Sequence, residues 1–314
     1  MPDSTSDALP LFNTSPAFRK THPPDESWQF GDGLRVETKL GAEWKKNEES
    51  GWKTMNVDEM EKPLVYKMLI SAIVPRPIAF VATLSDSGMP NLAPFSYFSL
   101  VSHNPPLVSV SFTLPSKGVK DTRENIKITK EFTVNIISEP FIEAANATSI
   151  NAPPEVDEFA ISGLTPLQSV CGIYHHYART PLNVIFSKDV VKPPRVRESA
   201  VSFECELFHF LDIAPSAVLP DGSSTSPSTT VILGRIRRAH IRHAVLSQDE
   251  ITVDTAALRA IARIGGVGYA RVGEGFDLAR PSWREDGETV RQILQRKGVH
   301  DRDVAKDAER NAGL

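Results

Sequence analysis

A lysine-bearing turn that leads into a helix is the segment of this sequence best suited to bind an anion. Lys117 and Lys120 lie in the turn, and a helix is predicted to begin near Asp121 or Thr122. A helix N-terminus offers unpaired N–H groups and a positive partial charge, which suit a phosphate, and the lysines add full charges beside it. An ordinary N-cap by Asp121 or Thr122, with both lysines solvated, fits the same pattern. The residues alone leave both interpretations open.

Polar side chains around a proline-interrupted strand form a second candidate, for contact with a flat ring. Asn91, Ser96, Tyr97 and Ser99 surround Pro94 in a β-rich run. A proline within a strand marks an edge or a bulge, where free backbone N–H and C=O groups could bind the edge of a heteroaromatic ring. An ordinary edge strand with polar side chains is the alternative that the spacing leaves open.

Other constellations point away from metal and dinucleotide chemistry. His175 and His176 are adjacent, so in an extended segment they face opposite sides and cannot share a metal ion. His240 and His243 lie among arginines, which disfavour a divalent cation. The glycine-rich segment 265–268 lacks the strand-to-helix context of a dinucleotide fingerprint. We expect no metal site.

The elements that must position these residues are mostly β-strands. Three runs at 78–84, 91–102 and 107–113 are separated by turn signals and predict an antiparallel meander. Helical spacing predicts helices at 64–73, 120–130 and 141–148, and further strands are predicted at 132–137, 183–187, 201–211 and 229–242. The predicted fold is mainly β with a few helices, and a closed or nearly closed antiparallel barrel would leave few exposed edges.

The strand predicted at 201–211 has a clear period of two. Val201, Phe203 and Cys205 alternate with Ser202 and Glu204, which predicts a strand with one buried face. The chain has two cysteines, and neither shows metal-ligand or redox-pair spacing. We therefore expect Cys205, like Cys171, to be a reduced structural thiol.

Composition places the chain among ordinary globular proteins. It has 314 residues, 40% hydrophobic content and a formal net charge of -4 from 35 basic and 39 acidic residues. This balance argues against nucleic acid or an anionic membrane as the main partner. No apolar stretch is long enough to span a bilayer, and the N-terminus lacks the apolar core of a secretory signal. We expect an intracellular, reducing compartment, the cytoplasm.

Composition also suggests three parts. Residues 1–58 are predicted to be an N-terminal extension that is partly flexible, because its first 30 residues are rich in Pro, Ser, Thr and Asp. Residues 59–275 carry the strand pattern and form the predicted main domain. Residues 276–314 are charged, and helical spacing at Val290, Ile293 and Leu294 predicts a helical tail.

An ordered series of short motifs gives the chain a resemblance to a known family. The motifs are residues 71–83 (SAIVPRPIAFVAT), 91–98 (NLAPFSYF), 104–108 (NPPLV), 120–122 with Asn125, 146–149 (NATS), 157–159 with 163–164, 191–196 (VKPPRV) with 198–199, and 263–266 with Tyr269. Together they resemble the flavin reductase-like, FMN-binding family, which includes flavoredoxin-like proteins. The resemblance covers about residues 60–275.

This resemblance implies an FMN-binding antiparallel split β-barrel that dimerises, with FMN at or near the subunit interface. It implies that one set of residues lines the isoalloxazine ring and ribityl chain: Thr83, Asn91, Ala93, Pro94 and Ser96. It implies phosphate contacts from Ser111, Thr113, Lys117, Lys120 and Thr122. It places a loop near the ring that carries Arg263, Gly265, Gly266 and Tyr269.

The resemblance implies an NAD(P)H-dependent FMN oxidoreductase, in which hydride passes from a transiently bound NADH or NADPH to flavin and on to free flavin, oxygen or another acceptor. One alternative is an FMN enzyme that acts on a specific organic substrate, for which His103, Tyr97 and Tyr269 are candidate proton donors. Another alternative is a non-enzymatic flavin-binding or interaction protein. The N-terminal extension, the insertion at 220–228 and the tail depart from a minimal family member and leave the substrate open.

Overall fold

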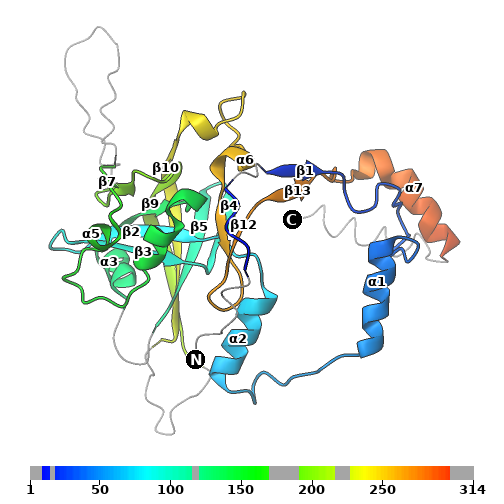
Figure 1. Cartoon of the computed structure of the whole chain (residues 1–314), viewed down its shortest axis with the longest axis horizontal. Helices are drawn as coiled ribbons and strands as arrows, with labels where there is room; N and C mark the ends of the chain where they lie inside the picture. Colours follow the sequence, from blue (N-terminus) through cyan, green and yellow to red (C-terminus); the bar gives the residue numbers. More distant parts are fainter. Residues whose placement is uncertain (1–8, 15–17, 115–119, 170–190, 216–226, 298–314) are drawn as a thin grey trace, which may run out of the picture. The chain divides into compact units, whose positions relative to one another are not determined.

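A strongly curled antiparallel sheet forms the centre of the molecule. The computed structural model describes residues 9–14, 18–114, 120–169, 191–215 and 227–297. Within these residues the sheet has seven strands in the order β3-β2-β6-β9-β10-β5-β4 (Figure 1). The strands are β2 (Ala79–Leu84), β3 (Pro90–Phe95), β4 (Phe98–His103), β5 (Pro106–Thr113), β6 (Glu131–Asn135), β9 (Val201–Ile213) and β10 (Thr229–Ile241).

The connection between β3 and β4 forces the sheet to curl. Only Ser96 and Tyr97 separate these strands, although they are the two opposite edges of the sheet. Two linking residues can span at most ~11 Å, whereas the edges of a flat seven-stranded sheet would lie ~29 Å apart. The curl brings the Phe95 ring of β3 to 4.5 Å from the Phe112 ring of β5. Across the described residues no strand ladder joins β3 to β4, so the sheet stops short of a closed barrel.

This arrangement corrects the predicted meander. The run at 91–102 is two strands rather than one: β3 pairs with β2, and β4 pairs with β5 on the far side of the sheet. The strands predicted near β2, β5, β6, β9 and β10 are confirmed with small shifts of their ends. The strand predicted at 183–187 lies outside the described residues, as do His175, His176, Cys171 and part of the 220–228 insertion.

Two apolar clusters pack on the two faces of the sheet. The strand β2 contributes side chains to both clusters. Ala79 and Val81 belong to the first cluster, and Phe80 and Ala82 belong to the second. Alternating side chains of a strand face opposite sides, so β2 is buried on both. Cys205 belongs to the first cluster as a fully buried free thiol, and burial raises its pKa; this confirms the predicted structural thiol.

The period-two pattern of β9 does not predict that its polar side is also buried: Ser202 is 2% exposed. Glu204 lies on the polar side of that pattern, yet its side chain is fully buried, and its Oε1 lies 2.7 Å from Nε2 of His240 on β10. The segment around β8 (Arg195–Val196) crosses this face: the Thr133 hydroxyl of β6 donates to the Pro194 carbonyl at 2.8 Å. A distant segment therefore buries a charged residue that alternation alone would leave in water.

Short helices fill the ends of this unit. They are α2 (Lys62–Ala72), α3 (Asp121–Thr129), the 3-10 turn η3 (Glu139–Phe141), α4 (Ile142–Ala147), α5 (Glu158–Ser162), the 3-10 turn η4 (His243–Val245) and α6 (Thr255–Leu258). Two small hairpins pair β7 (Pro166–Leu167) with β8, and β11 (Ile261–Arg263) with β12 (Tyr269–Arg271). The helices predicted at 64–73, 120–130 and 141–148 are confirmed by α2, α3 and α4.

A buried arginine ties α2 to the β11–β12 hairpin. The Arg76 guanidinium donates to the Ile70 and Ile73 carbonyls at 2.5 and 2.7 Å, and to the Ile264 carbonyl at 3.2 Å. The last carbonyls of a helix have no partner within the helix, so Arg76 satisfies them while it holds the hairpin. This contact fixes the start of the hairpin tip.

The N-terminal segment and the tail form a second unit, which comprises Arg19–Met60 and Glu274–Leu314. Within it, β1 (Arg19–Thr21) pairs in parallel with β13 (Glu274–Phe276). Figure 1 labels this pair, and the unit also contains α1 (Lys39–Asn47), the 3-10 turn η2 (Glu48–Ser50) and α7 (Trp283–Arg296).

Replacing Gly234 with alanine is expected to lower the free energy of unfolding by about 1–3 kcal/mol. A Cβ atom at Gly234 would lie 2.2 Å from Cζ of Phe132, so a ring in the core would have to move. Urea denaturation measures the loss. Gly273→Ala is the matched control, since its nearest neighbour would be 3.8 Å away. Equal stability of the two variants would contradict this packing.

Candidate functional site

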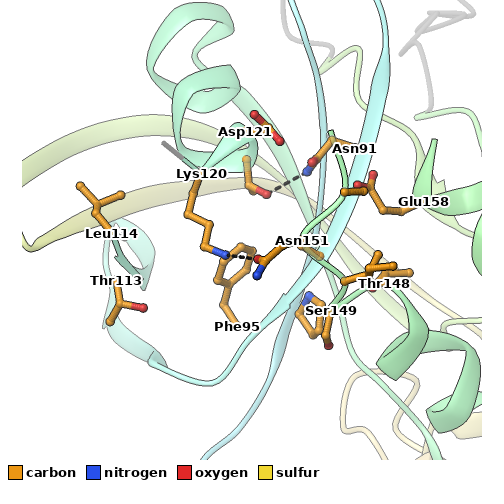
Figure 2. A pocket seen from close by; sticks show the side chains of 15 residues that line it. Asn91, Phe95, Thr113, Leu114, Lys120, Asp121, Thr148, Ser149, Asn151 and Glu158 are labelled. Carbon is orange, nitrogen blue, oxygen red and sulfur yellow. Dashed lines mark hydrogen bonds between the residues drawn. The ribbon is translucent and has the colours of Figure 1, made fainter. Parts of the chain in front are cut away.

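Two neighbouring hollows open at the end of the sheet where β3, α3 and α4 meet. The first has a volume of about 590 Å³ and the second about 370 Å³. Pro94 and Ser149 line both, so the hollows share a wall. The first, shown in Figure 2, is lined largely by polar residues: Asn91, Ala93, Pro94, Phe95, Thr113, Leu114, Lys120, Asp121, Thr122, Thr148, Ser149, Ile150, Asn151, Ala152 and Glu158. The second is lined by Ile78, Pro94, Ser96, Asn146, Ser149, Arg263, Val267 and Tyr269.

The N-terminus of α3 opens into the first hollow. The helix begins at Asp121, and Lys120 is its N-cap residue. The Lys120 side chain makes no capping hydrogen bond, and the Asp121 carboxylate lies close to its own backbone N–H. The N-cap is therefore neither Asp121 nor Thr122, and this helix start keeps N–H groups without a capping side chain from Lys120, which suits an anion.

Two side chains beside this terminus are held in place by amide groups. Lys120 Nζ donates to Asn151 Oδ1 at 3.2 Å, and Asn91 Nδ2 donates to Thr122 Oγ1 at 2.8 Å. Figure 2 shows both contacts as dashed lines. Because the Thr122 hydroxyl accepts from Asn91, its own proton remains free to point to a ligand oxygen.

Glu158 brings an acidic group to the opposite side of this terminus. Its Oε2 accepts the backbone N–H of Leu92 on the edge strand β3 at 3.2 Å. Burial raises the pKa of this carboxyl group, and the nearby carboxylates of Asp121 and Asp157 raise it further. Glu158 is 7% exposed, yet it lines the first hollow.

The second hollow is built around Tyr269 of β12. Its hydroxyl donates to Asn146 Oδ1 at 2.7 Å, and the Arg263 guanidinium lies 4.5 Å from its ring centroid. Arg263 also donates to the Val267 and Gly266 carbonyls at 3.0 and 2.7 Å. Arg263 therefore folds the tip of the hairpin and covers one face of Tyr269. Gly266 has φ of +60°, a left-handed conformation that glycine adopts readily.

The structure gathers most of the predicted site residues but not all. The hollows are lined by nine of them: Asn91, Ala93, Pro94, Ser96, Thr113, Lys120, Thr122, Arg263 and Tyr269. Thr83 lies behind the first hollow, fully buried, where its hydroxyl accepts from Asn125 at 3.0 Å. Five others, all described, line neither hollow: Ser111, Gly265, Gly266, Tyr97 and His103. Lys117 lies outside the described residues.

Several lining residues had no predicted role. Thr148, Ser149 and Asn146 belong to the motif at 146–149, which contributed to the resemblance but was not assigned a contact. Asn151 follows that motif, and Glu158 lies in the motif at 157–159. The signal for these residues was their presence in the ordered series, since neither motif has a local chemical pattern.

Two further findings bear on the class of protein. Within the described residues, no group of three or more His, Cys, Asp or Glu side chains is placed to hold a metal ion. No helix among them is both long and apolar enough to cross a membrane.

Replacing Glu158 with glutamine is expected to raise the melting temperature at neutral pH. Because the pKa of Glu158 is raised in the folded state, the folded chain holds this proton at pH values where the unfolded chain has lost it. The free energy of unfolding therefore falls as pH rises through that interval. The glutamine carbonyl can still accept the Leu92 N–H. In thermal melts the difference in melting temperature between Glu158→Gln and the wild type should grow from low to neutral pH. A difference that is constant with pH would contradict this account.

Comparison with known proteins identifies relatives that cover most of the chain. The family model described as Flavin reductase like domain matches residues 71–254. An uncharacterized protein of Halalkalibacterium halodurans is 32% identical over 235 residues, which are 74% of this chain and 99% of that protein.

Solved structures agree with this match. Nitrilotriacetate monooxygenase component B from Bacillus cereus superposes with a TM-score of 0.61 and 30% sequence identity, over 73% of this chain and 99% of that one. A Shewanella frigidimarina protein described as having a split barrel domain superposes with a TM-score of 0.53 and 21% identity, over 74% of this chain and 99% of that one. The similarity to the Shewanella frigidimarina protein concerns the fold alone.

Proposed function

This chain belongs to the flavin reductase-like family, and on that premise we propose that it is an FMN-dependent oxidoreductase that oxidises NADH or NADPH. The observation that carries the proposal is the uncapped N-terminus of α3, which opens with Lys120 and Thr122 into a polar hollow. A cofactor with a terminal phosphate fits this donor set, because N–H groups, a hydroxyl and an ammonium all donate to phosphate oxygens.

The second hollow suits the other end of the same cofactor. Ile78, Pro94 and Val267 offer apolar surface, while Ser96 and Asn146 offer polar groups to the edge of a ring. Since the hollows share Pro94 and Ser149, one elongated molecule could occupy both. When bound, FMN would supply a ring that accepts the hydride of NADH or NADPH and passes its two electrons to a second acceptor.

In this scheme the residues of the chain bind FMN and orient it toward the nicotinamide. Hydride transfer needs no general acid, which agrees with a second hollow whose one phenol, Tyr269, already donates to Asn146. The nicotinamide would stack only transiently, so no dinucleotide fingerprint is required. The solved relative from Bacillus cereus is named as one component of a monooxygenase, and this favours an acceptor that receives reduced flavin from the protein.

We also propose that the curled sheet is a split barrel that works as a homodimer in the cytoplasm. Leu100 and Val101 of the edge strand β4 support a partner subunit, since they are 67% and 50% exposed. An apolar pair on an edge strand is a typical contact between chains.

Steady-state oxidation of NADH and NADPH, followed with and without added FMN, tests the proposed activity. We expect oxidation that depends on FMN and on at least one nicotinamide. FMN binding without oxidation of either nicotinamide would contradict this reaction and favour a dedicated organic substrate. Absence of flavin binding would contradict the proposed function as a whole.

A further inference from the structure

A buried carboxyl group in the wall of the first hollow has a stability cost that its contacts within the chain do not explain. The Glu158 carboxylate accepts the Leu92 N–H at 3.2 Å, and its own backbone N–H also lies within reach. Within the described part of the chain it forms no ion pair, and its charged neighbours Asp121 and Asp157 are also acidic. A buried, unpaired carboxylate destabilises a fold.

The contact with Leu92 does not require a charge. The edge strand β3 presents this N–H away from β2, and a neutral glutamine or serine oxygen could accept it equally well. Residues that lower stability without a structural need are found where they serve a ligand. The negative charge of Glu158 is therefore best understood through the hollow that it lines.

The chemistry of the hollow selects the ligand group. A carboxylate accepts hydrogen bonds and donates none, so Glu158 cannot hold a phosphate oxygen. The part of a flavin that fits the polar wall formed by Asn91, Thr148 and Glu158 is the hydroxylated chain between phosphate and ring. We propose that Glu158 binds hydroxyl groups of the ribityl chain and so selects flavins that carry one. This rests on the proposed function, since it takes FMN as the ligand.

Riboflavin is the most informative probe, because it has the ribityl chain without the phosphate. In fluorescence titrations near neutral pH, Glu158→Gln should weaken riboflavin binding by about tenfold, as a charge-assisted hydrogen bond becomes a neutral one. Lumiflavin, which has the ring without the chain, should bind both proteins equally. FMN should lose less affinity than riboflavin, because the substitution also removes a charge that repels the phosphate.

Matched variants separate a direct contact between Glu158 and the ligand from the effect of removing any nearby negative charge. Glu155→Gln removes an exposed carboxylate three residues away and should change no affinity. Glu158→Ala removes both acceptor oxygens and should weaken riboflavin more than Glu158→Gln does. Circular dichroism and thermal melts confirm that each variant is folded before titration.

The outcomes distinguish this inference from the function on which it rests. Unchanged riboflavin affinity in a folded Glu158→Gln protein would overturn the inference, as would an equal loss for lumiflavin. Both results would leave FMN binding by the wild type intact. A wild-type protein that binds neither FMN nor riboflavin would overturn the proposed function and the inference together.

Discussion

Alanine substitution of both Lys120 and Thr122 is expected to weaken FMN binding by about 100-fold. Lys120 carries the charge at the start of α3, and Thr122 presents a hydroxyl held by Asn91 at 2.8 Å. Each removed contact to a phosphate oxygen is worth roughly 1.5 kcal/mol or more, and the two together give about two powers of ten. Riboflavin lacks the phosphate, so its affinity should be nearly unchanged. Parallel fluorescence titrations with both flavins measure the difference.

The contrast between the two flavins is the internal control of this experiment. An equal loss for FMN and riboflavin would indicate that the substitutions distort the hollow, and the phosphate assignment would be wrong. Lys67→Ala removes an exposed lysine from α2 and should leave both affinities as in the wild type. FMN affinity equal to the wild type in the folded double variant would also contradict the assignment.

Replacing Asn135 with leucine is expected to cost about 3–5 kcal/mol of unfolding free energy. The Asn135 side chain is fully buried and uses both of its groups. Its Nδ2 donates to the Phe80 carbonyl at 3.0 Å, and its Oδ1 accepts from the Val196 N–H at 3.0 Å and the Ser202 hydroxyl at 2.7 Å. One amide thus joins β2, β8 and β9 to β6, and leucine would leave these buried groups unsatisfied.

Urea denaturation of a small series measures this effect. Ser202→Ala removes one donor and leaves Asn135 bonded to Val196, so it should cost about 1 kcal/mol. The double variant should lose less than the sum of the two single losses, because the residues share one hydrogen bond. Additive losses, or a loss below 1 kcal/mol for Asn135→Leu, would show that this network does not hold the strands together.

Local signals in the sequence predicted single elements well. The β-rich run ending at Leu84, with the turn at Gly88, predicted β2 and its pairing with β3, and helical spacing predicted α3. The topology was harder, because nothing between Phe95 and Phe98 marks a break. Ser96 and Tyr97 are neither glycine nor proline, yet the chain crosses there from one edge of the sheet to the other.

Long-range contacts explain the remaining differences between the sequence-based predictions and the structure. Glu204 follows the alternation of its strand, and the segment around Arg195 that helps bury it is not predictable from that alternation. β1 pairs with β13 although Arg19 and Glu274 lie at opposite ends of the chain. Glu158 reaches Leu92 across 66 residues, so its place in the hollow has no local signal.

The start of α3 shows the limit of capping rules at the candidate site. Asp121 and Thr122 are both types that cap helices, so the sequence could not separate capping from phosphate binding. The observed N-cap is Lys120, whose side chain cannot accept a hydrogen bond.

A visible absorbance spectrum under anaerobic conditions, taken before and after adding NADH or NADPH to the FMN-loaded protein, tests the central claim most directly. We predict a yellow protein whose flavin absorbance bleaches with at least one nicotinamide, because bound flavin and hydride transfer are then observed together. A protein that cannot be loaded with FMN, or one whose flavin stays oxidised with both nicotinamides, would contradict it.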